Sequence, residues 1–242
     1  METLNIKEQY EKRLDTLWAN AESTIDTLFA NAKFKVNEQY IKGLKEIIGR
    51  KYAASESVTK GSVFFVGINP SYKANQPDKH FFKFDTCGDQ HFKRHIEIKD
   101  RIKEKLPDLE YSYLDFIFVR DNDQNTVLKM LNDSNLTAFI EGHIEIFKEI
   151  VEKAAPKVIS VNNNAIKKFL LNRPDIINCT QRHPDSKYEK DSKIEAHIIT
   201  EPHALKGTPV FFTAMLAGEW GYKNFPLESL CNLADYIKDA AK

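Results

Sequence analysis

Four short, largely apolar runs constrain the fold of this chain more than any other feature of its sequence. They cover residues 63–66, 113–119, 158–161 and 209–214. A short apolar run without alternation is typical of a strand that is buried on both faces. Amphipathic helical patterns separate or follow these runs, at 93–106, 124–133, 136–154, 165–171 and 227–241. The alternation predicts an α/β fold, a three-layer αβα arrangement with a central, mostly parallel four-stranded sheet. Residues 176–179 and 196–200 are further candidates for short strands.

The first fifty residues repeat apolar side chains at the three- and four-residue steps of helices. One such face extends from Tyr10 to Phe29, and a second extends from Tyr40 to Ile48, where Gly49 is a plausible end. We expect a helical hairpin that packs on the main domain, and a pair of helices that binds a partner protein is the alternative. The predicted organisation is an N-terminal helical extension at 1–55 and one α/β domain at 56–242.

Charge and composition exclude several classes of protein. The 242 residues include 35 basic and 35 acidic side chains, so the net charge is zero. A protein that coats nucleic acid through bulk attraction is usually basic, so sequence-independent coating is not expected. No apolar run approaches the roughly 20 residues of a membrane helix, and the charged first residues lack an apolar signal core. The three cysteines, Cys87, Cys179 and Cys231, fit a reducing cytoplasm. We therefore expect a cytoplasmic protein with no membrane partner, and its oligomeric state is left open.

Ligands of such a sheet bind at the carboxyl ends of its strands, which here means the loops at 67–73, 120–123 and 215–224. In the first loop, Gly67 permits a ligand to approach the backbone, and Pro70 biases Asn69 away from helical geometry. The Asn69 amide does not titrate near neutral pH, so it orients a ligand or a water and is not a general base. A simple turn, with Asn69 capping its own backbone, is the alternative.

The segment VFFVGINPS resembles the first signature motif of the uracil-DNA glycosylase superfamily. It is most similar to the mismatch-specific and single-strand-selective branches, which carry an Asn between the Gly-hydrophobic pair and Pro. The segments YLDFIFVR, AAPKVISVNNNAIKKFL and GTPVFFTA resemble later segments of the family, in the same order. The resemblance covers about residues 60–240 and leaves the N-terminal helices as an addition.

The resemblance implies that the protein hydrolyses the N-glycosidic bond of a damaged base that is flipped out of DNA. Asn69 would be the catalytic residue that orients the attacking water. The backbone near Gly67, Ile68 and Ser71 would contact the base. An aromatic ring, Phe81 or Phe82, would stack on it, with Phe84 as a further candidate. Asp115 or Arg120 would read the edge of the base. The implied partner is DNA, and neither a cofactor nor a metal is implied.

The second signature loop departs from the family pattern of His or Asn followed by Pro-Ser. The matching positions hold Met215-Leu216-Ala217, followed by Gly218-Glu219-Trp220-Gly221. Gly218 would still permit close approach of the backbone, and Trp220 would act as a wedge or a stacking wall. Because the usual donor is missing, the alternative is a non-catalytic module on the same fold that binds a nucleobase, a nucleotide or nucleic acid. An open pocket between this loop and Asn69 would favour catalysis.

Two other groupings of residues are weaker candidates. Cys87, His91 and His95 have helical spacing and are suitable zinc ligands, but no fourth ligand is indicated, so no metal site is predicted. The segment that begins at His183 resembles the missing His-Pro-Ser motif only superficially. It precedes the last strand instead of following it, so a surface turn is expected there.

Overall fold

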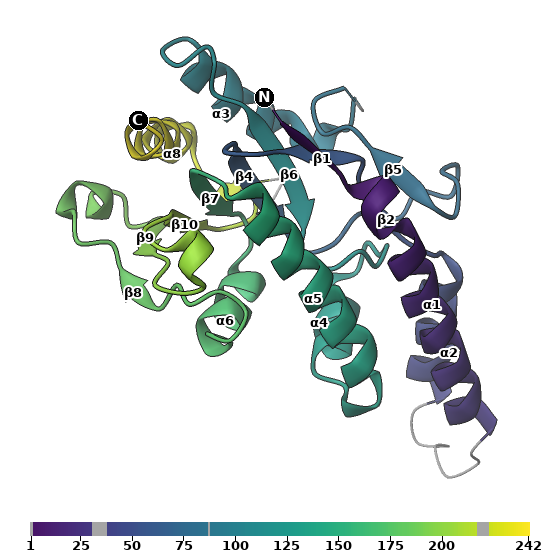
Figure 1. Cartoon of the computed structure of the whole chain (residues 1–242). Helices are drawn as coiled ribbons and strands as arrows, with labels where there is room; N and C mark the ends of the chain where they lie inside the picture. The colour runs from purple at the N-terminus through teal and green to yellow at the C-terminus, as the bar shows by residue number, and fades with distance from the viewer. Residues whose placement is uncertain (1, 31–37, 87, 217–222) are drawn as a thin grey trace.

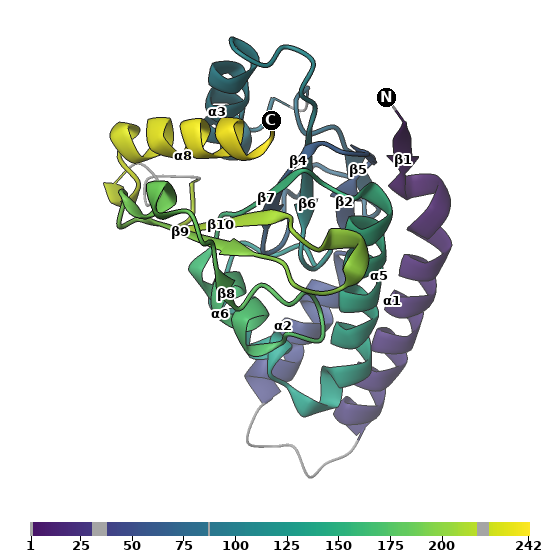
Figure 2. The ribbon, with the colours of Figure 1, turned by 60° about the vertical axis from the view of Figure 1, so that its left-hand side comes forward.

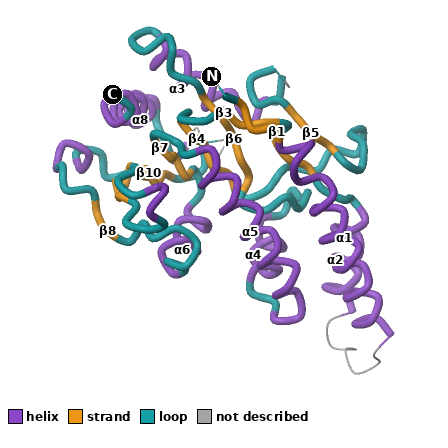
Figure 3. The backbone as a smooth tube through the Cα atoms, in the orientation of Figure 1, coloured by secondary structure: helices purple, strands orange, loops and turns teal. Residues whose placement is uncertain are grey.

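The computed structural model describes residues 2–30, 38–86, 88–216 and 223–242 (Figure 1). Its α-helices are α1 (Ile6–Ala30), α2 (Glu38–Gly49), α3 (Lys93–Lys103), α4 (Gln124–Leu131), α5 (Thr137–Ala154), α6 (Asn164–Asn172) and α8 (Leu227–Ala240). Its strands are β1 (Thr3–Asn5), β2 (Ala53–Ser55), β3 (Ser57–Thr59), β4 (Val63–Gly67), β5 (His80–Phe82), β6 (Tyr111–Asp115), β7 (Val158–Val161), β8 (Gln181–Arg182), β9 (Ile194–Ile198) and β10 (Pro209–Thr213). Figure 3 shows the main strands in the middle of the molecule with helices around them. The predicted α/β class is confirmed.

The main sheet contains six strands in the order β6-β4-β7-β10-β9-β8. The first four are parallel, whereas β9 is antiparallel to both β10 and β8. The prediction of a four-stranded sheet is therefore wrong in its strand number, although each of the four apolar runs supplies one parallel strand. Strand β8 escaped prediction because it has only two residues, both exposed, and so carries no apolar pattern.

The second strand is shorter than its apolar run. The prediction extended it to Val119, but β6 ends at Asp115. The residues after it remain buried without continuing the ladder, because the Phe118 N–H donates to His143 Nδ1 (3.3 Å) and the Phe118 carbonyl accepts from the Ala53 N–H (3.1 Å). Residues 116–119 are therefore apolar because they are buried, and not because they form a strand. Likewise, the candidate strand at 176–179 is only an isolated bridge between Asn178 and Glu201.

Two apolar cores lie on the two faces of the sheet. Alternate residues of β4 supply them, since Phe64 and Val66 belong to one core and Val63 and Phe65 to the other. Helices α1, α2, α4, α5 and α6 bury side chains in the first core, whereas α3 and α8 bury theirs in the second. Figure 2 shows α8 and α3 on one side of the strands and α5 and α1 on the other.

The N-terminal helices are integrated with the sheet. The hairpin prediction agrees with α1 and α2, which lie side by side (Figure 1). Trp18 of α1 and Leu44 of α2 share the first core with the strands, and β1 pairs with β3. The division between 1–55 and 56–242 stays a prediction. None of the described helices is long and apolar enough to cross a membrane.

Candidate functional site

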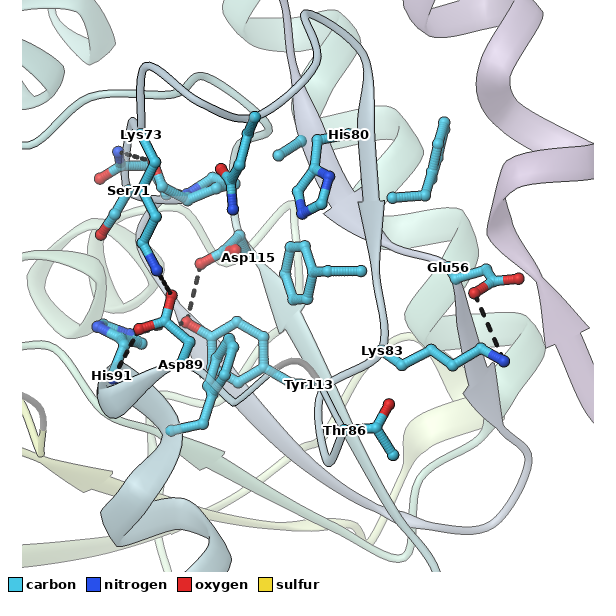
Figure 4. A pocket seen from close by; sticks show the side chains of 17 residues that line it. Glu56, Ser71, Lys73, His80, Lys83, Thr86, Asp89, His91, Tyr113 and Asp115 are labelled. Atoms are coloured by element: carbon cyan, nitrogen blue, oxygen red, sulfur yellow. Dashed lines mark hydrogen bonds and ion pairs between the residues drawn. The ribbon is translucent and has the colours of Figure 1, made fainter.

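Two adjoining cavities lie where β4 and β6 end. The β5 cavity, of about 350 Å³, is enclosed by the loop after β4, by β5 and by the end of β6 (Figure 4). The β7 cavity, of about 460 Å³, lies toward the segments that follow β7 and β10. Four residues line both cavities: Asn69, Ser71, His91 and Tyr113. Volumes of this size are in the range of small-molecule sites.

Asn69 is held in one orientation at the junction of the cavities. Its exposed fraction is 8%, and its Nδ2 donates to the carbonyl oxygens of Pro70 (3.0 Å), Val119 (3.2 Å) and Asp121 (2.8 Å). Because these carbonyl groups fix the NH₂ group, Oδ1 is the atom left to accept a hydrogen bond. No donor to Oδ1 is found among the described residues. The side chain therefore presents a preoriented acceptor, and the simple capping turn does not describe these contacts.

Gly67 allows the strand to pass close to two polar side chains. A Cβ at this position would lie 2.0 Å from the Tyr113 hydroxyl oxygen and 2.6 Å from Asp115 Oδ1. Gly67 and Asp115 are paired across β4 and β6, so both belong to the carboxyl ends of neighbouring parallel strands. The close approach predicted for Gly67 is thus made by side chains of the protein itself.

Asp115 is a buried carboxyl group on the wall of the β5 cavity. Its exposed fraction is 2%, and the Tyr113 hydroxyl donates to its Oδ1 (2.9 Å; Figure 4). Burial raises the pKa of Asp115 to about 7, although the hydrogen bond from Tyr113 acts in the opposite direction. Burial also raises the pKa of Tyr113, which therefore remains a neutral donor. At neutral pH the carboxyl group can accept or release a proton.

Charged side chains next to this carboxyl group are paired with one another. Lys73 lies 2.7 Å from Asp89, and the ion pair together with the backbone N–H of His91 lowers the pKa of Asp89 despite its partial burial. The His91 ring lies 3.5 Å from the Tyr113 hydroxyl, and burial lowers its pKa. At the other side of the cavity, Lys83 lies 3.9 Å from Glu56 (Figure 4). The site therefore carries both signs of charge and no strong excess of either.

Aromatic rings form one wall of the β5 cavity. Phe81 and Phe82 of β5 both line it and are partly buried. The Phe82 ring stacks on Phe92 (5.7 Å between centroids, 26° between planes), and Phe81 contacts Tyr52 edge-on (5.9 Å). Phe84 is buried in the second core and stacks on Tyr113. Of the predicted stacking residues, Phe81 and Phe82 therefore reach the cavity.

Arg120 does not line either cavity. Its guanidinium group is buried beneath the loop after β4, where it donates to the carbonyl oxygens of Lys73 (3.3 Å), Pro77 (2.7 Å) and Asp78 (3.2 Å). It also donates to the Arg50 carbonyl group (3.1 Å). Arg120 was expected to be a candidate reader of a ligand edge, but the structure places it as a support of the cavity wall.

The remaining predicted residues fall into two groups. Ser71 and the backbone of Gly67 and Ile68 lie beside Asn69, while the Ile68 side chain points into the first core. Gly218 and Trp220 lie outside the described residues. Before them, Met215 and Leu216 line the β7 cavity with Asn69, and Gln124 Nε2 donates to Met215 Sδ (3.3 Å). The described part of this loop therefore lines the same cavity as Asn69.

Tyr113 and His91 are site residues that the sequence did not reveal as such. Tyr113 belongs to an apolar run, and its one signal was its position two residues before Asp115, on the same face of a strand. His91 was considered only as a metal ligand with Cys87 and His95. Cys87 lies outside the described residues, and the His91 and His95 rings are 6.1 Å apart. No group of three or more metal-ligating side chains is found in the part of the chain that the structure describes.

Comparison of the chain with known proteins assigns it to no family. No protein-family model matches it, and no curated protein matches it. The case for a function therefore depends on the site itself and on the sequence resemblance.

Proposed function

We propose that the protein is an N-glycosyl hydrolase of the uracil-DNA glycosylase type, which acts on a damaged base flipped out of DNA. The observation that carries this proposal is the fixed orientation of Asn69, whose three carbonyl partners leave Oδ1 to orient a water. A group that holds a water in the attacking position lowers the barrier, because the water no longer has to reach the substrate from bulk solvent in the right orientation.

The β5 cavity supplies the surroundings that a planar base requires. Phe82 offers a ring that is already held against Phe92, and Asp115 offers a buried carboxyl group for polar contact. Stacking on an aromatic ring together with hydrogen bonds to the base edge is the usual way in which a flipped base is read. Ser71 lines the same cavity, and Ile68 lines the adjoining β7 cavity.

The proposal also includes the finer details of the fold and setting. We infer that the four parallel strands and the helices on their two faces form the three-layer core expected from the resemblance, with residues 1–55 added to it. A cytoplasmic role in base-excision repair follows from the proposed substrate, and both cysteines in the described residues are free thiols.

A second function is favoured by one specific observation. Met215 borders the β7 cavity where the resemblance implies a hydrogen-bond donor, and its thioether is itself an acceptor from Gln124. A site that lacks a donor to stabilise the leaving base is better suited to binding a base than to cleaving it. Under this alternative, the protein is a binding module for a nucleobase, a nucleotide or nucleic acid.

A cleavage assay separates the two functions. Oligonucleotides containing uracil or hypoxanthine, single- and double-stranded, are incubated with the wild-type protein, with Asn69→Ala and with the control Asn20→Ala. Asn20 lies on the exposed surface of α1. The proposal predicts cleavage by the wild type and by Asn20→Ala, and a loss of about 10²-fold or more in Asn69→Ala.

Two other outcomes decide against parts of the proposal. Full activity in Asn69→Ala removes this residue from the mechanism. The absence of cleavage on every substrate, combined with saturable binding of nucleobases or nucleotides to the wild type, supports the binding module.

A further inference from the structure

Hydrolysis of an N-glycosidic bond needs a group that accepts a proton from water, and Asn69 is not that group. An amide does not titrate near neutral pH, and the Asn69 NH₂ group is held by three carbonyl groups. A proton acceptor must therefore come from another residue that shares the cavity with Asn69.

Several of the titratable groups around the β5 cavity are already paired with one another. The Asp89 carboxylate is committed to Lys73 and to the His91 backbone, and Glu56 lies beside Lys83. The remaining titratable side chains of the lining are His80, His91, Tyr113 and Asp115. His80 is on β5, across the cavity from β6, and His91 contacts the Tyr113 hydroxyl group.

Asp115 combines burial, fixed geometry and an available oxygen. The Tyr113 hydroxyl holds Oδ1, whereas no donor to Oδ2 is found among the residues described. The carboxyl group lies at the carboxyl end of β6 and is paired with Gly67, two residues before Asn69. Figure 4 shows it on the cavity wall, next to Tyr113 and on the same side of the cavity as Ser71 and Lys73. Burial also brings its pKa close to neutrality, where a general base works best, since the nearby Lys73 is itself paired with Asp89.

We propose that Asp115 accepts the proton of the water that Asn69 orients. This step depends on the proposed function. The water oxygen forms a bond to the anomeric carbon as the bond from that carbon to the base nitrogen breaks, and the electron pair of the broken bond leaves with the base. The proton moves from the water to Asp115, which then returns it to the departing base.

The test measures kcat and KM between pH 5 and 9 for the wild type, Asp115→Asn and Tyr113→Phe. Asp108→Asn is the matched control, because Asp108 is exposed and lies in the turn before β6. The wild-type kcat is expected to rise with pH through about 7. In Asp115→Asn, kcat is expected to fall by about 10²–10⁴-fold, with loss of this pH dependence and little change in KM.

Tyr113→Phe provides a second readout that does not require removal of the carboxyl group. The hydrogen bond from Tyr113 lowers the Asp115 pKa, so its loss raises that pKa and moves the rise in kcat to higher pH. Circular dichroism verifies that each variant is folded, and if Asp115→Asn is not, the shift in Tyr113→Phe decides the question.

The other outcomes of this experiment contradict either the role of Asp115 or the proposed function. If Asp115→Asn retains kcat but changes KM or the preferred base, then Asp115 reads the base edge and the proton-acceptor proposal is wrong. An unshifted pH profile in Tyr113→Phe also contradicts it. If the wild type cleaves no substrate, the proposed function itself fails, and this step fails with it.

Discussion

Gly67 brings the backbone close to two polar side chains of the site. The space for a Cβ is occupied by the Tyr113 hydroxyl and Asp115 Oδ1, at 2.0 Å and 2.6 Å. Neither atom ends a long flexible chain, since Tyr113 is packed among rings and donates to Asp115. A side chain at position 67 would therefore displace the Asp115 carboxyl group that lines the β5 cavity.

We predict that Gly67→Ala disrupts the site by displacing Tyr113 and Asp115. Overpacking of this kind costs about 1–3 kcal/mol of unfolding free energy, and the displaced carboxyl group should lower activity or ligand affinity strongly. Urea denaturation and the cleavage or binding assay measure the two effects. Gly43→Ala is the control, because no atom lies within 4 Å of its Cβ and Ala favours helix α2. An active Gly67→Ala protein of wild-type stability would contradict the prediction.

Single residues were predictable from the sequence where local chemistry decides their role. Asn69 follows the buried strand β4 and Asp115 is the last residue of the buried strand β6, and the structure brings both to the β5 cavity. Arg120 also follows the second apolar run, but its surroundings depend on how a loop nearly fifty residues earlier folds back over it. A contact between segments so far apart in the sequence gives no sequence pattern around position 120, so the role of Arg120 could not be predicted.

At the scale of elements, the loop between β4 and β5 forms a wall of the β5 cavity and is held in place by side chains from other segments. Arg120 donates to three of its carbonyl groups and to Gln76 Oε1 (3.3 Å). The guanidinium groups of Arg50 and Arg120 lie 4.5 Å and 5.3 Å from the centroid of the Tyr72 ring. The Asn122 side chain accepts from the Tyr72 N–H and donates to the Tyr72 carbonyl oxygen. The loop therefore has a defined shape without a ligand.

Arg120→Met should loosen this loop while leaving the sheet intact. The variant retains the apolar stem but leaves several carbonyl groups without a donor, which costs roughly 1–3 kcal/mol. We expect faster proteolytic cleavage within residues 71–79 and a higher KM or Kd, with a smaller effect on kcat. Arg101→Met, at an exposed position of α3, is the control. Unchanged proteolysis and affinity would show that the wall does not depend on Arg120.

The elements themselves were predictable in proportion to their burial. The four parallel strands are buried on both faces, so each produced a largely apolar run. The same signal overextended β6, because the residues after it are buried in the first core without strand pairing. The edge strand β8 could not be predicted, because its two residues are both exposed and carry no apolar pattern.

At the scale of the whole molecule, two buried histidines couple stability to pH. Both His95 and His143 are buried without a neighbouring carboxylate, and desolvation lowers each pKa to about 3. His143 accepts the Phe118 N–H at Nδ1 and packs against the rings of Trp18 (5.0 Å) and Phe139 (4.5 Å). Its position joins α1, α5 and the segment after β6, so its protonation should affect the common core.

His143 should therefore contribute to the pH dependence of the free energy of unfolding. The histidine pKa is about 6.5 in the unfolded chain and about 3 in the folded protein, so between these values the unfolded state binds more protons. The free energy of unfolding then falls as pH decreases, by about 1.4 kcal/mol per pH unit for this residue. The raised pKa of Asp115 acts in the opposite direction, so the difference between variants is the quantity to measure.

Urea denaturation at several pH values between 6 and 4 isolates the contribution of His143. His143→Gln removes the titrating ring, so its unfolding free energy should depend less steeply on pH than that of the wild type, by about 1.4 kcal/mol per unit. His203→Gln is the control, because the His203 side chain is exposed and lies outside both cores. It should preserve the wild-type slope. Equal slopes for the wild type and His143→Gln would show that this histidine is not held neutral in the folded core.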